Sequence, residues 1–142
     1  IAPRPDIINI VPGKCSFTLD FRQFDGELFE EGKREVEKLI VSCAARRGLK
    51  YCFKKAAEAA PVVFDRGMVE LVGSRAAFLG FDSMKMISGA SHDAQFLSSF
   101  CPTVMIFVPS VGGRSHCPEE WTDMKDLENG CNVLLHSVLE LV

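Results

Sequence analysis

The sequence lacks the features of membrane proteins, disulfide-bonded scaffolds and nucleic-acid-binding proteins. Its apolar runs stop at six to eight residues, which is too short to cross a bilayer. The six cysteines form no CxxC pair and lie mostly inside expected helices and strands, so they are typical of reduced thiols in a cytoplasmic protein. The net charge of −3 gives no reason to expect nucleic acid or an anionic membrane as a partner.

Histidine is also scarce, and the chain has no HExxH pair that would hold zinc from one helix. Two of the three histidines, His92 and His116, lie in the glycine- and serine-containing loops SGASHDA and GGRSHCPEE. A loop histidine is often only a hydrogen-bonded structural residue. Beside carboxylates it can instead bind a metal or donate a hydrogen bond to a polarised carbonyl. Two histidines do not complete a catalytic zinc site, which needs about three protein ligands.

The segments around these loops predict a βαβ unit. Residues 83–87 and 103–108 have the apolar and β-branched character of strands, and about 92–100 predicts a short helix between them. The two strands would then be parallel, and the loops that follow them would share the sheet edge where open α/β sheets bind ligands. We therefore expect His92 and His116 to be neighbours.

The rest of the chain predicts two blocks, with a boundary near Pro61. In the first block, alternation over residues 15–22 predicts a half-exposed strand, and residues 50–54 predict a second one. Helical periodicity predicts longer helices over residues 27–47, 66–79 and 124–141. The fold class is therefore α/β.

Five segments occur together in the order and spacing of one protein family. They are PDIINIVPG at 5–13, FTLDFR at 17–22, SGASHDA at 88–94, PTVMIFVPS at 102–110 and GGRSHCPEE at 112–120. Together they resemble the C-terminal part of the hydantoinase/carbamoylase family of dinuclear metal amidohydrolases, which is related to aminoacylases and carboxypeptidase-type metallopeptidases. The resemblance implies that residues 1–60 are the second half of an α/β lid, or dimerisation, domain. Residues 61–142 would be the C-terminal βαβ portion of a metallopeptidase-like catalytic domain.

The resemblance also implies a role for five residues. His116 matches a metal ligand, and His92 matches a catalytic histidine that contacts the substrate. Ser91 would offer its backbone N–H to the substrate. Asn9 and Arg22 match the pair that holds the substrate's carboxylate and its neighbouring polar group, a role that suits the planar fork of arginine. Without the resemblance, Asn9 is a turn residue and Arg22 a solvated strand residue.

The chain departs from the family pattern in several places. Serine stands at Ser91 and aspartate at Asp6, where the family has glycine and usually asparagine. Cys117 replaces an asparagine beside the metal ligand, and Arg114 replaces an apolar residue. The family's remaining ligands are a His-x-Asp pair, a Glu-Glu pair that includes the general base, and a further histidine. We expect all of them, and the lid histidine that acts across the dimer, upstream of Ile1.

The implied reaction is metal-dependent hydrolysis of a C–N bond in an N-carbamoyl amino acid or a related ureido acid, such as allantoate, ureidoglycolate or ureidopropionate. The implied cofactors are two divalent ions, zinc or manganese, and the implied partner is a second copy bound through the lid. We expect this chain alone to retain no metal and to be inactive. An aminoacylase or dipeptidase and a non-catalytic dimerisation or interaction fragment stay open as alternatives.

Overall fold

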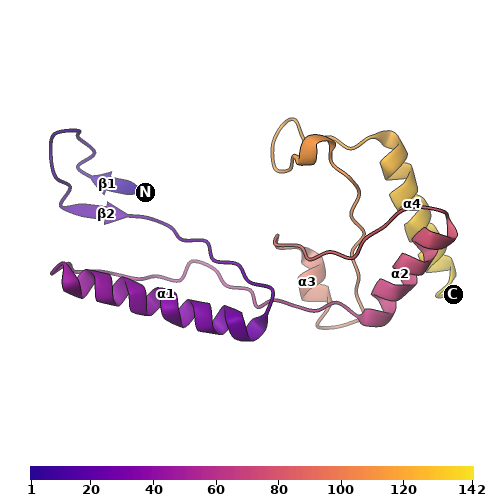
Figure 1. Ribbon diagram of the computed structural model, residues 1–142, viewed down its shortest axis with the longest axis horizontal. Helices are drawn as coiled ribbons and strands as arrows, with labels where there is room; N and C mark the ends of the chain where they lie inside the picture. The colour runs from indigo at the N-terminus through magenta and orange to yellow at the C-terminus, as the bar shows by residue number, and fades with distance from the viewer. The chain divides into compact units, whose positions relative to one another are not determined.

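The computed structural model describes all residues of the chain and divides them into two compact units, Ile1–Pro61 and Val62–Val142. In chain order the elements are β1 (Ala2–Arg4), β2 (Lys14–Ser16), α1 (Gly26–Arg46), α2 (Arg66–Phe78), α3 (Asp93–Leu97), a 3-10 turn η1 (Val111–Gly113) and α4 (Met124–Leu139), as Figure 1 shows. The two strands form one antiparallel pair in which Ala2 lies opposite Ser16. None of the helices is long and apolar enough to span a bilayer.

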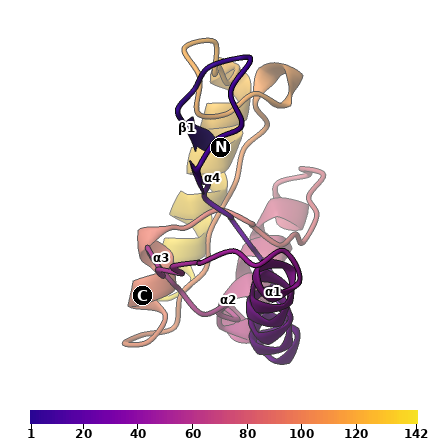
Figure 2. The same cartoon turned by 90° about the vertical axis from the view of Figure 1, so that its left-hand side faces the viewer.

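Helix α1 is the scaffold of the first unit, and Figure 2 views it nearly along its axis. It begins at the N-cap Asp25, whose carboxylate accepts hydrogen bonds from the backbone N–H groups of Glu27 and Leu28. It ends just before Gly48, which has a φ of +63°, a conformation that glycine adopts without a steric penalty. The predicted helix over residues 27–47 is therefore confirmed.

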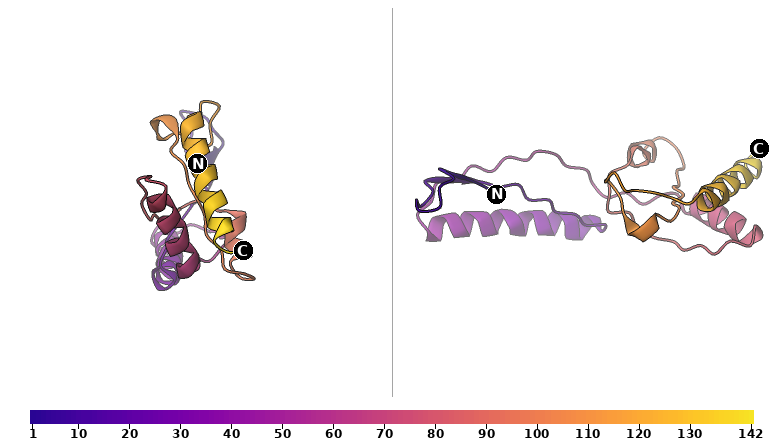
Figure 3. Two further views of the ribbon diagram at one scale, coloured as in Figure 1. Left: turned by 90° about the vertical axis from the view of Figure 1, so that its right-hand side faces the viewer. Right: turned by 90° about the horizontal axis from the view of Figure 1, so that it is seen from above.

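Two extended segments run back along α1, as Figures 1 and 3 show. In the segment that leads into the helix, the ring of Phe21 stacks on Phe29 with 5.9 Å between centroids. It lies so close to Gly32 that any β-carbon there would collide with it. In the segment that follows the helix, Glu58 forms an ion pair of 2.7 Å with Lys33. Side chains, rather than a β-ladder, hold both segments on the helix.

In the second unit, α2 and α4 lie side by side, as Figure 1 and both views of Figure 3 show. Arg75 forms an ion pair of 2.9 Å with Glu140, and Phe78 makes a ring contact with His136. The buried residues of the unit, Ala76, Val133 and Ser137, lie on these two helices. The segment 103–108 reaches α4 at Gly130, where an added β-carbon would collide with the side chain of Val108.

Several predicted strands do not form. Residues 83–87, 103–108 and 50–54 contain no strand, and β2 covers only Lys14–Ser16 near the start of the predicted strand over 15–22. The apolar pattern reports which residues tend to be buried, but a strand also needs a hydrogen-bonded neighbour. A helix needs only its own backbone, and each predicted helix is present, although α3 is shorter than expected. The structure thus shows helices and a small sheet, and no βαβ unit.

Few side chains of either unit are buried. Phe29 and Ala44 are the buried apolar residues of the first unit, and most large apolar side chains of the chain are exposed. They include residues on α4, namely Leu127, Leu134, Leu135, Val138 and Leu139.

The ion pairs of Glu58 generate a pH-dependent prediction. Hydrogen bonds from Lys33 and Lys55 lower the pKa of Glu58 from 4.5 to about 2. A carboxyl whose pKa is lower in the folded state stabilises that state above its ordinary pKa, and this contribution is lost as the pH falls from about 4.5 towards 2. We therefore expect the carboxyl carbon of Glu58 to titrate near pH 2 by NMR.

In Lys33→Ala, the titration midpoint of Glu58 should rise towards its ordinary value, because the hydrogen bond that lowers its pKa most is lost. Lys38→Ala is the matched control, since Lys38 pairs with Glu35 on the same helix and not with Glu58. An ordinary Glu58 midpoint in the unsubstituted chain would show that the segment after α1 is not held by this pair.

Candidate functional site

His92 lies at the start of α3, and two neighbours orient its imidazole. Its backbone is extended and provides the N-cap of the helix, with no capping bond from the side chain. The hydroxyl of Ser88 lies 2.7 Å from the Nε2 atom. The ring of Phe107 meets the imidazole edge-on, with 5.7 Å between centroids and an angle of 65°. The imidazole is therefore fixed from two sides although it is only half-buried.

Ser91 precedes this histidine and is exposed. It is not among the residues with positive φ, so serine fits the backbone where the resembling family has glycine. The departure from the family pattern at this position therefore creates no backbone strain.

His116 lies in a loop that closes on itself. The backbone N–H of Val111 donates to the carbonyl of Trp121 at 2.8 Å, and the hydroxyl of Ser110 donates to the carbonyl of Arg114 at 2.5 Å. Within this loop His116 has a φ of +58°, and no other non-glycine residue of the chain has a positive φ. Its backbone N–H donates to Oε2 of Glu120 at 2.7 Å.

A non-glycine residue in the left-handed region costs about 1–2 kcal/mol, and such residues cluster at functional sites. The charge-assisted bond to the Glu120 carboxylate offsets part of that cost. The imidazole of His116 is therefore exposed, and the hydrogen bond to Glu120 holds the loop backbone at His116.

Arg22 and Asn9 belong to the first unit. The guanidinium of Arg22 donates from Nε to Oδ1 of Asp20 at 2.9 Å and from Nη2 to Oδ2 at 2.7 Å. These hydrogen bonds lower the pKa of Asp20 and raise that of Arg22. Asn9 is exposed in the turn closed by the bond from Ile10 N–H to the Ile7 carbonyl. No hydrogen bond joins Asn9 to Arg22.

The side chains of this chain do not by themselves fit a metal site. No three or more histidine, cysteine, aspartate or glutamate side chains are placed to hold an ion together. No hydrogen bond or ring contact joins His92 to His116, and Oε2 of Glu120 accepts a hydrogen bond from the backbone N–H of His116 rather than from its imidazole.

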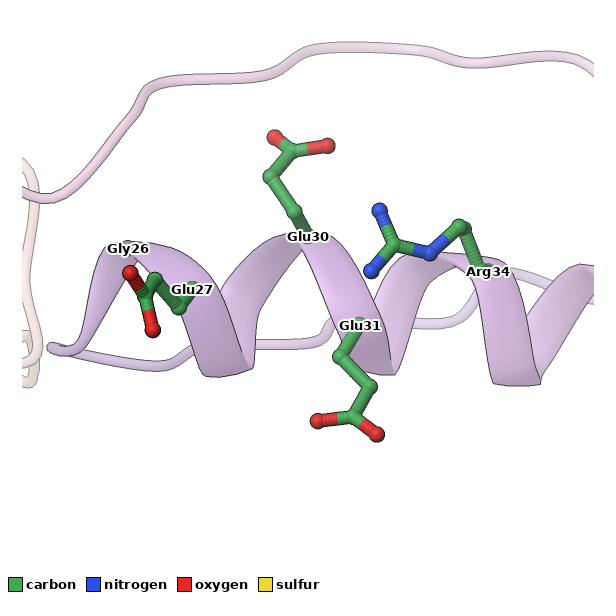
Figure 4. A pocket seen from close by; sticks show the side chains of 5 residues that line it. All are labelled: Gly26, Glu27, Glu30, Glu31 and Arg34. Carbon is green, nitrogen blue, oxygen red and sulfur yellow. The ribbon is translucent and has the colours of Figure 1, made fainter.

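A hollow on the surface of α1 contains none of the predicted site residues. It is lined by Gly26, Glu27, Glu30, Glu31 and Arg34. Figure 4 shows the three glutamates pointing in different directions from the outside of the helix. This hollow is an open helix surface.

Sequence reasoning did not predict the contacts that three residues make around the histidines, although Glu120 was a possible contributor to a metal site. Ser88 and Phe107 hold the imidazole of His92, and Glu120 holds the backbone of His116. Ser88 lies four residues before His92 and Glu120 four residues after His116, so both partners stood within the motifs already singled out. Nothing in the sequence pattern distinguished them from their polar neighbours.

The family model for peptidase family M20/M25/M40 matches residues 5–140. Among curated proteins, the chain is 37% identical to an uncharacterised hydrolase of Haemophilus influenzae, over 99% of the chain and 34% of that protein. It is 31% identical to an allantoate amidohydrolase of Bacillus subtilis, over 99% of the chain and 34% of that protein. It is 35% identical to an N-carbamoyl-L-amino-acid amidohydrolase of Rhizobium meliloti, over 96% of the chain and 33% of that protein. The chain thus spans about a third of the length of these relatives.

The solved structures agree. An amidase of the hydantoinase/carbamoylase family from Burkholderia multivorans superposes with a TM-score of 0.90 and 35% identity, over 97% of this chain and 34% of that one. A putative amidohydrolase/peptidase from Burkholderia cenocepacia gives a TM-score of 0.82 and 36% identity, over 97% and 34%. These matches confirm the resemblance to hydantoinase/carbamoylase proteins seen in the sequence. The chain belongs to peptidase family M20/M25/M40.

Proposed function

We propose that the protein containing this chain is an amidohydrolase that cleaves a C–N bond in an N-carbamoyl amino acid or a related ureido acid. The observation that carries the proposal is the likeness, over nearly the whole chain, to proteins named allantoate amidohydrolase and N-carbamoyl-L-amino-acid amidohydrolase. Allantoate and N-carbamoyl amino acids each combine a carboxylate with a ureido group. The protein must therefore recognise both a negative charge and a polar carbonyl.

Arg22 and Asn9 are suited to the carboxylate end of such a substrate. The contact between Arg22 and Asp20 is already a two-point grip of a guanidinium on a carboxylate. A substrate carboxylate would take the place of Asp20 in the same geometry, which a lysine cannot reproduce. The Asn9 amide would add one donor and one acceptor beside it.

His92 and Ser91 are suited to the carbonyl that is attacked. The oriented imidazole of His92 would donate a hydrogen bond to the oxygen on which negative charge develops, and the backbone N–H of Ser91 would reinforce it. Donors held in place before the reaction stabilise that charge without a cost of reorganisation. The contacts of His92 with Ser88 and Phe107 hold the imidazole in place in this way.

Because the side chains of this chain do not make a metal site by themselves, His116 would be a single ligand of a two-metal centre of zinc or manganese. The remaining ligands and the general base would come from residues outside this chain. We further propose that residues 1–60 are part of a lid that pairs with a second copy, and that residues 61–142 belong to the catalytic domain.

An aminoacylase or dipeptidase is the second candidate, because the matching family model is that of a peptidase family. Turnover of N-carbamoyl amino acids, compared with N-acyl amino acids and dipeptides, separates the two candidates. Failure to hydrolyse any of them would favour a non-catalytic dimerisation or interaction role.

Arg22→Lys tests the carboxylate grip in the protein that contains this chain. Loss of the bidentate, charge-assisted pair should lower kcat/KM on a carboxylate substrate. The loss of transition-state stabilisation calculated from it should be about 2–4 kcal/mol, and the metal content should stay unchanged. Arg34→Lys, on the exposed surface of α1, is the matched control and should have no effect. If Arg22→Lys retains near-normal kcat/KM, Arg22 is only a solvated surface residue.

Metal analysis of this chain by itself tests the claim that it supplies only one ligand. After dialysis, the purified chain should hold far less than one zinc or manganese ion per molecule and should not turn over N-carbamoyl amino acids, since a catalytic site needs about three ligands. Elemental analysis beside a turnover assay measures both quantities. Tight stoichiometric metal would mean that a carboxylate or Cys117 completes a site with His116.

A further inference from the structure

Ser88 is placed to control which nitrogen of His92 carries the proton. Its hydroxyl oxygen lies 2.7 Å from Nε2 of His92, a short distance for a neutral hydrogen bond. The same oxygen accepts a hydrogen bond from the backbone N–H of Ala90 at 3.3 Å. The hydroxyl is thereby tied to the backbone of the loop that leads into α3.

The hydrogen-bond capacities of the two groups indicate the direction of the contact. A serine hydroxyl has one hydrogen to donate and two lone pairs to accept with, and a neutral imidazole has one donor and one acceptor nitrogen. Ala90 already occupies a lone pair of Ser88. If Ser88 donates to Nε2 of His92, the hydroxyl has both an acceptor and a donor. If Nε2 donates instead, the exposed hydroxyl keeps only water as an acceptor for its hydrogen.

We propose that Ser88 is a positioning residue that donates its hydroxyl hydrogen to Nε2 of His92 and holds the imidazole as the Nδ1–H tautomer. The N–H offered to the substrate carbonyl is then on Nδ1. Phe107 meets the ring edge-on and limits its rotation, so the tautomer and the orientation of His92 are set together. The catalytic consequence of this pair rests on the role proposed above for His92.

A serine bonded to an imidazole is also the arrangement that activates a serine nucleophile. That arrangement needs a group that orients the far nitrogen of the imidazole. No carboxylate in the chain forms a hydrogen bond with Nδ1 of His92. The geometry therefore favours positioning of the imidazole over nucleophilic attack by Ser88.

NMR of the imidazole nitrogens tests the pair without any assay of activity. In the ¹⁵N-labelled chain at about pH 9, where imidazoles are neutral, long-range ¹H–¹⁵N correlations distinguish a protonated ring nitrogen from a bare one. We expect His92 to show a protonated Nδ1 and a bare Nε2. In Ser88→Ala the signals should move towards a mixture of the two tautomers, whereas Ser88→Thr should keep the Nδ1–H form.

Ser99→Ala is the matched control for this measurement. The hydroxyl of Ser99 donates to the carbonyl of Phe96 at 2.7 Å. Removing this hydroxyl therefore also deletes one serine hydrogen bond near α3, but not the bond to His92. A protonated Nε2 in the unsubstituted chain, or the same His92 tautomer with and without the Ser88 hydroxyl, would overturn the proposal.

Kinetics of the protein that contains this chain test the catalytic consequence. Ser88→Ala should lower kcat by about 2- to 12-fold with little change in KM, the range expected for one hydrogen bond that acts in the transition state. Ser88→Thr should restore most of the loss. Added to His92→Ala, the Ser88→Ala change should have no further effect, because it acts through His92.

The outcomes separate this inference from the proposed function. Additive losses in the double variant, or covalent labelling of Ser88 by a fluorophosphonate, would overturn the positioning role. Correct tautomers in a protein that hydrolyses none of the ureido or acyl substrates would overturn the proposed function and the catalytic consequence of the pair. The Ser88–His92 hydrogen bond itself would stand.

Discussion

Backbone hydrogen bonding divides this chain into two kinds of segment. The helices form their own backbone hydrogen bonds, and the extended segments are held mainly by side-chain contacts. The helices satisfy their internal N–H and C=O groups, and the carboxylates of Asp25 and Asp65 cap the first turns of α1 and α2. The extended segments have no ladder partner outside the β1–β2 pair. They are held on helices by a few close contacts, Phe21 over Gly32 in the first unit and Val108 against Gly130 in the second. The loops that contain His92 and His116 follow such extended segments in the chain.

The two histidines of the site are held in different ways that lead to the same result. A side chain four residues upstream fixes the imidazole of His92, and a carboxylate four residues downstream fixes the backbone of His116. In each case a loop outside any β-ladder presents one imidazole, and only the imidazole of His92 is itself held by contacts. This arrangement is consistent with the proposed roles, in which His92 contacts the substrate and His116 fills one coordination position of a metal, and the chain places no three ligands together for a whole metal centre.

The sequence predicts the helices well because the 3.6-residue period and the stop at Gly48 are local signals. It overpredicts strands, as at residues 103–108, since pairing partners are not encoded in the strand itself. The motifs around His92 and His116 carry the family membership, which the comparisons confirm. The contacts of Ser88 and Glu120 could not be predicted from the sequence. Ser88 bonds one ring nitrogen of His92 and Glu120 bonds the backbone N–H of His116, and both bonds depend on loop conformations that residue spacing does not determine.

The most direct test of this account is a crystal structure of the protein that contains this chain, with an N-carbamoyl amino acid or a non-hydrolysable analogue bound. We expect Arg22 to release Asp20 and to bind the ligand's carboxylate at two points, with Asn9 beside it. We also expect His92 at the carbamoyl oxygen and His116 on a metal ion. A ligand bound elsewhere, with Arg22 still on Asp20 and His116 away from any metal, would contradict it.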